Sequence, residues 1–194
     1  MIPPSLTVRP ELVEGLSLSC HDSAPAHRVE GIELFIERLP NGRLWLRYHI
    51  DAPIDDLVLP DPAPRARADD LWQHLCCELF LRRPDGTEYL EWNFSPSSRW
   101  AGYRFSAYRT GREDIVVPAA PQILLDASDT HLALEVDVAL PADWRDSPLL
   151  TGLSAVIEEA GGGKSYWALQ HPPGPPDFHH PDCFALTLEA PGTA

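Results

Sequence analysis

Hydrophobic and polar residues alternate along most of the chain. Residues 44–50 place Leu, Leu, Tyr and Ile on one side and Trp, Arg and His on the other. A period of two is typical of a β-strand with one buried face. Comparable runs occur at 32–36, 75–82, 89–94, 100–108, 122–126, 131–140, 153–159, 166–170 and 184–188. The pattern therefore predicts about nine or ten strands.

Turn residues separate these runs, and helical periodicity is nowhere sustained. Asn41-Gly42 lies between two alternating runs and predicts a tight hairpin. Residues 52–70 contain four prolines and predict a long irregular connection, while 141–144 allow a single helical turn. Many short strands with frequent turns favour an antiparallel β-sandwich. We expect residues 1–28 to form an N-terminal arm that packs on one domain spanning residues 29–190.

Composition and charge narrow the classes of partner. The net charge is −14, which disfavours nucleic acid and anionic membranes as partners. Proline accounts for 21 of 194 residues, which argues against a helical bundle because proline breaks helix interiors. A hydrophobic content of 44% is too high for a disordered chain. The composition therefore indicates a folded, proline-rich β protein that does not bind nucleic acid or anionic membranes.

The sequence also contains features that relate to the cellular compartment of the protein. The first residues lack the basic start and apolar stretch of a signal peptide, and no apolar run is long enough to span a membrane. The four cysteines form no Cys-x-x-Cys pair, so neither a zinc ribbon nor a thioredoxin motif is present. We expect four reduced thiols in a cytoplasmic protein.

Polar and aromatic side chains on several predicted strands are candidates for ligand binding. Carboxylate, amide and guanidinium groups suit the hydroxyls of a sugar, and an exposed indole stacks on the C–H face of a sugar ring. The polar candidates are Glu78, Glu91, Asn93 and Arg104, joined by Glu135 on a further strand. The aromatic candidates are Trp72, Trp100 and Trp167. The alternatives are a solvated sheet face for the polar row and core packing for the tryptophans.

Other motifs give weaker indications of a functional site. The loop at 171–183 is rich in proline and contains His171, His179 and His180, which makes metal binding conceivable, although their spacing fits no standard zinc site. A rigid structural loop beside a pocket is the favoured interpretation. Residues 161–165, Gly-Gly-Gly-Lys-Ser, lack the first glycine of a P-loop and predict a hairpin turn. No Gly-x-Ser-x-Gly elbow is present, so we expect binding without catalysis and no cofactor.

Three stretches make the chain similar to a known superfamily. Residues 70–81 (DLWQHLCCELFL), 89–96 (YLEWNFSP) and 99–103 (RWAGY) resemble the DOMON-like superfamily, and in particular the bacterial DOMON-like proteins related to the family 9 carbohydrate-binding modules. The resemblance covers about residues 29–190. It implies a jelly-roll β-sandwich that binds a sugar or haem.

The resemblance also implies a set of site residues. In the family 9 modules two tryptophans clamp a sugar, assisted by a Glu and an Arg. Trp72 and Glu78 match that pattern, and Arg104 and Trp167 are the counterparts on the later strands. We therefore expect a small-ligand-binding sandwich that takes a saccharide or sugar derivative, with Glu91, Asn93 and Trp100 as additional candidates. The alternatives are a haem or redox-cofactor protein and an enzyme acting on cell-wall sugars. The single methionine, Met1, removes the usual Met–His pair of haem ligands.

Overall fold

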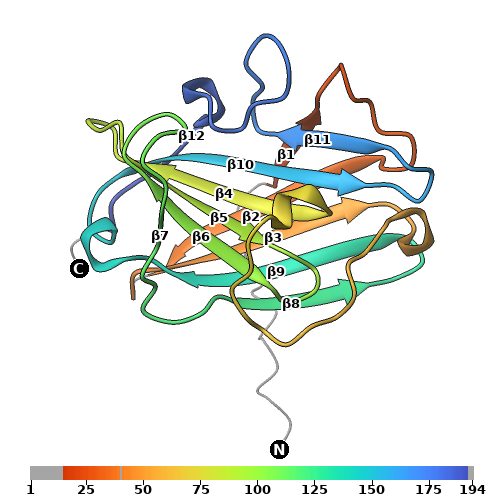
Figure 1. Ribbon diagram of the computed structural model, residues 1–194, viewed down its shortest axis with the longest axis horizontal. Coiled ribbons are helices and arrows are strands. Elements are labelled where there is room, and N and C mark those ends of the chain that lie inside the picture. The colour runs from red at the N-terminus through yellow and green to blue at the C-terminus, as the bar shows by residue number, and fades with distance from the viewer. Residues whose placement is uncertain (1–14, 40, 192–194) are drawn as a thin grey trace, which may run out of the picture.

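The computed structural model describes residues 15–39 and 41–191, and these form an antiparallel β-sandwich (Figure 1). Four short 3-10 helices connect the strands: η1 (Ile54–Asp56), η2 (Leu71–Gln73), η3 (Ala142–Trp144) and η4 (Pro181–Cys183). The described strands are β1 (Leu16–Cys20), β2 (Gly31–Leu39), β3 (Arg43–Asp51), β4 (Cys76–Arg82), β5 (Tyr89–Phe94), β6 (Trp100–Phe105), β7 (Glu113–Asp114), β8 (Gln122–Ala127), β9 (His131–Ala139), β10 (Leu149–Glu158), β11 (Lys164–Ala168) and β12 (Leu186–Leu188).

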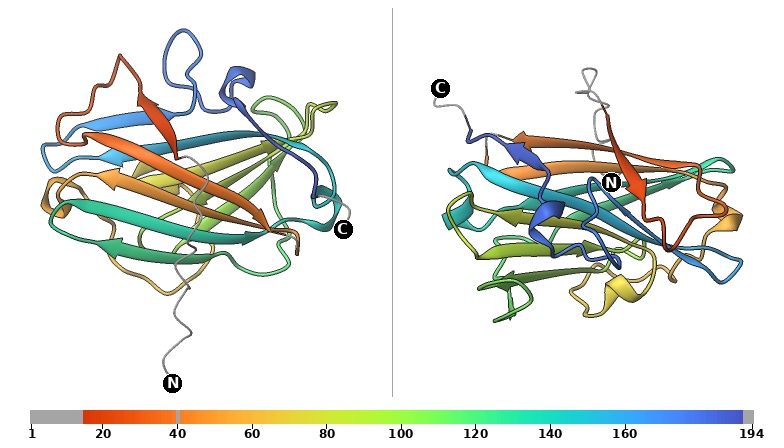
Figure 2. Two further views of the ribbon diagram at one scale, coloured as in Figure 1. Left: turned by 180° about the vertical axis from the view of Figure 1, so that it is seen from behind. Right: turned by 90° about the horizontal axis from the view of Figure 1, so that it is seen from above.

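The strands form two layers that β1 joins. Sheet A has the order β1-β2-β3-β9-β8, and sheet B has the order β7-β6-β5-β4-β10-β11, with β12 beside the start of β10. The first part of β1 pairs with β2, and its last residues pair with β11. The view from above in Figure 2 places β2 and β3 on one side and β4, β5 and β6 on the other. The predicted all-β sandwich is confirmed.

The predicted hairpin at residues 41–42 joins β2 to β3. Gly42 has a φ of 73°, a conformation that glycine adopts without strain. A Cβ at this position would also lie 2.6 Å from the Arg145 side chain. The pairing runs from Leu39 opposite Arg43 to Gly31 opposite Asp51, which keeps the hydrophobic rows of both strands on the same face.

The main core lies between the two sheets. In β3, Leu44, Leu46, Tyr48 and Ile50 are fully buried, while the residues between them are partly exposed. Burying one large aliphatic side chain stabilises the fold by roughly 1.5–3 kcal/mol. The Tyr48 hydroxyl donates a hydrogen bond of 2.7 Å to the backbone oxygen of Glu78, so its burial leaves no polar group unpaired.

Sheet B is covered on its outer face as well. All six residues of β5 are buried, whereas a strand with one solvated face would alternate. A second hydrophobic cluster lies on this outer face and includes Phe80, Tyr89 and Phe105, with Phe178 and Phe184 from the C-terminal segment packed on them. The proline-rich C-terminal segment therefore covers one end of the outer face and leaves room for a pocket beside it.

The structure corrects several details of the predicted elements. It contains twelve strands within the described residues, and the sequence pattern missed β1 and the two-residue β7. The helical turn at 141–144 is confirmed as η3, and the connection at 52–70 is irregular apart from η1. All four cysteines are free thiols, as expected. The predicted arm at 1–28 includes β1, but residues 1–14 lie outside the described part of the chain, as does Pro40 of the hairpin turn.

No helix among the described residues is long and apolar enough to cross a membrane.

Candidate ligand-binding pocket

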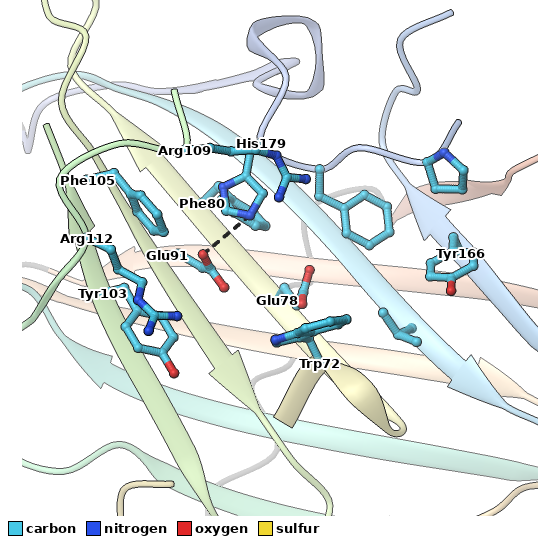
Figure 3. A pocket seen from close by; sticks show the side chains of 13 residues that line it. Trp72, Glu78, Phe80, Glu91, Tyr103, Phe105, Arg109, Arg112, Tyr166 and His179 are labelled. Atoms are coloured by element: carbon cyan, nitrogen blue, oxygen red, sulfur yellow. Dashed lines mark ion pairs between the residues drawn. The ribbon is translucent and has the colours of Figure 1, made fainter. Parts of the chain in front are cut away.

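A pocket of about 620 Å³ opens on the outer face of sheet B (Figure 3). Its floor comes from β4, β5, β6 and β10, and its walls come from η2, β11, the 106–112 loop and the proline-rich C-terminal loop. Its volume lies in the range of small-molecule sites. The lining residues are Trp72, Glu78, Phe80, Glu91, Tyr103, Phe105, Arg109, Arg112, Val156, Tyr166, Pro176, Phe178 and His179.

Two carboxylates reach the pocket from neighbouring strands. Glu78 on β4 lies opposite Asn93 of β5, and Phe80 lies opposite Glu91, so the two glutamates are diagonal neighbours on one face. Glu78 is 3% exposed and Glu91 is 5% exposed. Figure 3 shows both carboxylates pointing into the pocket.

Each carboxylate accepts a hydrogen bond from a neutral side chain. The Ser154 hydroxyl donates to Oε2 of Glu78 over 3.0 Å, and Nδ2 of Asn93 donates to Oε1 of Glu91 over 2.6 Å. Burial, followed by the charge of Glu91, raises the pKa of Glu78 to about 8. Burial also raises the pKa of Glu91. The two groups titrate as a pair, and at neutral pH they hold a proton that an exposed pair would have lost.

His179 lies above Glu91 and is neutral at physiological pH. Burial and the nearby Arg109 lower its pKa to about 4. Its Nδ1 lies 2.8 Å from the Tyr89 hydroxyl, which itself accepts the backbone N–H of Arg109 over 3.1 Å. The hydroxyl then donates to Nδ1, and the proton of the neutral ring resides on Nε2. That nitrogen lies 3.7 Å from Oε2 of Glu91.

An ion pair fixes the two loops that border the pocket. The Arg109 guanidinium donates to Oδ1 of Asp177 over 2.7 Å, and the Tyr108 hydroxyl donates to Oδ2 over 2.5 Å. Burial opposes ionisation of Asp177, but these two donors lower its pKa, so the carboxyl stays charged. The backbone N–H of His179 also donates to Oδ1 of Asp177. These contacts join the 106–112 loop to the proline-rich loop and hold His179 in place.

Aromatic side chains form much of the remaining wall. Trp72 belongs to η2 and is 52% exposed, which leaves one face of its indole free for a ligand. The Lys164 ammonium donates to the backbone oxygen of Gln73, which ties η2 to β11. On the opposite side, the Arg112 guanidinium lies 4.9 Å from the centre of the Tyr103 ring. The Tyr103 hydroxyl donates to Asp69 over 2.7 Å, which fixes the ring at the rim.

Three of the residues predicted from the sequence lie together in this pocket, namely Trp72, Glu78 and Glu91. Asn93 lies opposite Glu78 in the strand pairing and is 1% exposed; it does not line the pocket, and its amide donates to Glu91 instead. Its Oδ1 accepts the Cys76 thiol over 3.6 Å.

Arg104 lies outside the pocket, which corrects its predicted place beside Glu78. It occupies the opposite face of β6 from Tyr103 and forms ion pairs with Glu88 and Asp143, at 3.4 and 3.2 Å. The predicted polar face of β6 was assigned to the wrong side, because both sides of this strand carry aromatic residues. Glu135 lies on sheet A, where it pairs with Arg47.

Trp167 and Trp100 also lie outside the pocket, contrary to the prediction that they contact the ligand. Trp167 is 5% exposed and belongs to the core between the sheets, where its indole N–H donates to Ser165 over 3.0 Å. Its neighbour Tyr166 faces the pocket, since side chains alternate along β11. Trp100 is 6% exposed and packs in the same core. Neither indole is placed to stack on a ligand.

The three histidines named as metal candidates lie in different surroundings. His171 donates through Nε2 to the backbone oxygen of Ser19, and His180 accepts the backbone N–H of Asp182 at the start of η4. Only His179 faces the pocket. Across residues 15–39 and 41–191, no group of three His, Cys, Asp or Glu side chains is arranged to hold a metal ion.

The pattern of the sequence did not single out Tyr103, Arg109, Arg112 and Tyr166, which also line the pocket. One signal could have placed Tyr103, namely Gly102 on β6. The buried Trp92 lies opposite Gly102, and a Cβ there would meet its Nε1 at 3.3 Å. Pairing the large core tryptophan with the glycine fixes the inner face of β6 and turns Tyr103 outward.

Comparison with known proteins shows the fold but no family. No family model matches the chain, and no curated protein matches it. One similar solved structure is a candidate carbohydrate-binding protein from Bacteroides uniformis ATCC 8492, with 13% identity and a TM-score of 0.62 over 87% of this chain and 82% of that chain. A family 9 carbohydrate-binding module from Caldicellulosiruptor kristjanssonii, solved with cellotriose, matches with 12% identity and a TM-score of 0.49 over 84% of this chain and 75% of that one. The Bacteroides match shows that the two chains share a fold.

Proposed function

We propose that this protein binds a saccharide in the pocket on the outer face of sheet B. The observation that carries the proposal is the juxtaposition of a half-exposed indole, Trp72, with two buried carboxylates, Glu78 and Glu91. An indole covers the C–H face of a sugar ring, while carboxyl groups exchange hydrogen bonds with its hydroxyls. The pocket can therefore contact both the apolar C–H face and the polar hydroxyls of a sugar ring.

The rest of the pocket suits a small polar ligand in the same way. Arg109 and Arg112 add guanidinium donors at the rim, and Tyr166 adds a hydroxyl on the opposite wall. Because the ion pair with Asp177 fixes Arg109 before binding, little conformational entropy is lost when a ligand arrives. The shared fold with a candidate carbohydrate-binding protein supports the proposal.

The haem alternative fits the pocket less well. Ligation by two histidines needs two imidazoles that face each other, and among the described lining residues only His179 is a histidine. Its Nδ1 is already bound to Tyr89. Met1 lies outside the described residues. The residues present therefore favour a saccharide.

Binding is tested with a panel of mono- and oligosaccharides of neutral, acidic and amino type, measured by calorimetry. We expect at least one saccharide to bind, and Trp72→Ala to weaken that binding about tenfold or more because the stacking surface is lost. Leu124→Ala is the matched control, since Leu124 is 48% exposed on sheet A. The proposal fails if no member of the panel binds, or if both variants affect binding equally.

A further inference from the structure

Among the described residues, His179 is the only basic side chain that contacts a carboxylate of the pocket, 3.7 Å from Glu91, and burial keeps its imidazole neutral at physiological pH. Within residues 15–39 and 41–191, no Lys or Arg forms an ion pair with Glu78 or Glu91, and no hydrogen bond reaches Oε1 of Glu78. Arg109, which lies nearby, pairs with Asp177 instead. Buried carboxylates are normally paired with a cation or with several donors. Here each accepts one hydrogen bond from a neutral donor. The charges of Arg109 and Arg112 offset the burial of the pair only in part, since the pKa of each glutamate is still raised, so the pocket floor can accept more positive charge.

The walls above the carboxylates also suit a cation. Trp72, Phe105 and Phe178 line the same space, and the faces of such rings attract positive charge. The Tyr103 ring beside them already has the guanidinium groups of Arg67 and Arg112 over it. The net charge of −14 favours the approach of cations from solution.

We propose that the saccharide recognised by this pocket is an amino sugar, whose ammonium group binds at the carboxylates of Glu78 and Glu91. This inference rests on the proposed function and narrows its ligand class. The ammonium donates three hydrogen bonds, and the two carboxylates offer the free oxygens that the protein itself leaves without donors. Trp72 then stacks on the sugar ring.

Binding of an ammonium has a proton signature that a neutral sugar lacks. Burial raises the pKa values of both glutamates, and the charge of Glu91 adds to the rise at Glu78, so the pair holds a proton near neutral pH. The arriving ammonium replaces that proton as the neutralising charge, and the proton leaves to the buffer. The other titratable or charged groups that face the pair are Cys76, Tyr89, Tyr103, Arg109, Arg112 and His179, while Tyr48 and Cys77 interact with it from the core on the other side of sheet B.

Calorimetry with three matched sugars tests the proposal at pH 6.5, where the amine of glucosamine is protonated. We expect glucosamine to bind about tenfold more tightly than glucose or N-acetylglucosamine, because charge-assisted hydrogen bonds are about twice as strong as neutral ones. Repeating the titration in buffers of different ionisation enthalpy should show proton release with glucosamine and none with glucose.

Variants separate the role of the carboxylates from general binding. Glu78→Gln should reduce the preference for glucosamine over glucose to less than about threefold and abolish proton release. Glu33→Gln is the control, since Glu33 is an exposed carboxylate on β2. If Glu78→Gln does not fold, proton release by the wild-type protein still decides the question.

The outcomes distinguish this inference from the function on which it rests. If glucose or N-acetylglucosamine binds as tightly as glucosamine without proton release, the amino-sugar inference is overturned and saccharide binding stands. If none of these three sugars binds but another saccharide of the panel does, the amino-sugar inference is again overturned while saccharide binding stands. If no saccharide of any class binds, the proposed function is overturned as well.

Discussion

The buried carboxyl of Glu78 gives the protein a pH dependence of stability that can be worked out in advance. The group has a pKa of about 8 in the folded protein, raised by burial and by the charge of Glu91, against an ordinary value of 4.5. Below pH 4.5 the carboxyl is protonated in both the folded and the unfolded protein, so it does not lower the free energy of unfolding. Between pH 4.5 and 8 the unfolded chain releases the proton while the folded protein keeps it, so stability falls as the pH rises. Above pH 8 the loss is complete.

The magnitude follows from the size of that pKa difference. Each pH unit between the two pKa values corresponds to about 1.4 kcal/mol, so the full loss is at most about 5 kcal/mol. Relaxation of the pocket and coupling to Glu91 reduce this upper bound. Even half of that loss is a large fraction of the free energy of unfolding of a typical domain, which is about 5–15 kcal/mol.

Replacing Glu78 by glutamine isolates the effect. Urea unfolding of the wild-type protein and of Glu78→Gln at pH 5, 6, 7 and 8 gives the stability difference at each pH. We expect the variant to gain several kcal/mol relative to the wild type between pH 5 and pH 8, because glutamine does not ionise. Glu33→Gln on the exposed side of β2 should change by less than about 1 kcal/mol over the same range. A difference that is independent of pH for Glu78→Gln would refute the assigned burial and coupling of the two carboxylates.

Three further predictions test other parts of the structure. Trp144→Ala should lower the free energy of unfolding by about 3–5 kcal/mol in urea titrations, because the indole is fully buried and stacks under the Arg83 guanidinium at 4.3 Å. Asp177→Asn should weaken saccharide binding several-fold in calorimetry, because the link between the two pocket loops through Arg109 loses its charge. Trp167→Phe should keep saccharide affinity within about twofold while it lowers stability, since Trp167 lies in the core, and a large loss of affinity would restore its predicted stacking role.

The sequence predicted the strands well because their burial follows a simple period. Along β3, alternation of Leu44, Leu46, Tyr48 and Ile50 with partly exposed residues marks the inner face without ambiguity. The same rule failed on β6, because sheet B is covered on both faces and aromatic residues occupy both sides of the strand. Period alone therefore located Glu78 and Glu91 but misplaced Arg104.

The pocket was predictable only in part because half of its wall comes from loops. Arg109 and His179 enter it through segments far apart in the sequence, and the contact that aligns them is the ion pair to Asp177. No local pattern encodes such a pairing. The proline content of 171–183 did indicate a rigid loop, and its place beside the pocket agrees with that interpretation.

The proposed saccharide site, the pocket around Trp72, can be observed directly through its indole. The chain has six tryptophans, and each gives one indole N–H signal in a proton–nitrogen correlation spectrum. On titration with a saccharide that binds, we expect a saturable shift of the Trp72 signal, while the signals of the core indoles Trp144 and Trp167 stay in place. Saturable binding that moves a core or sheet A signal and leaves Trp72 unchanged would contradict the proposed site.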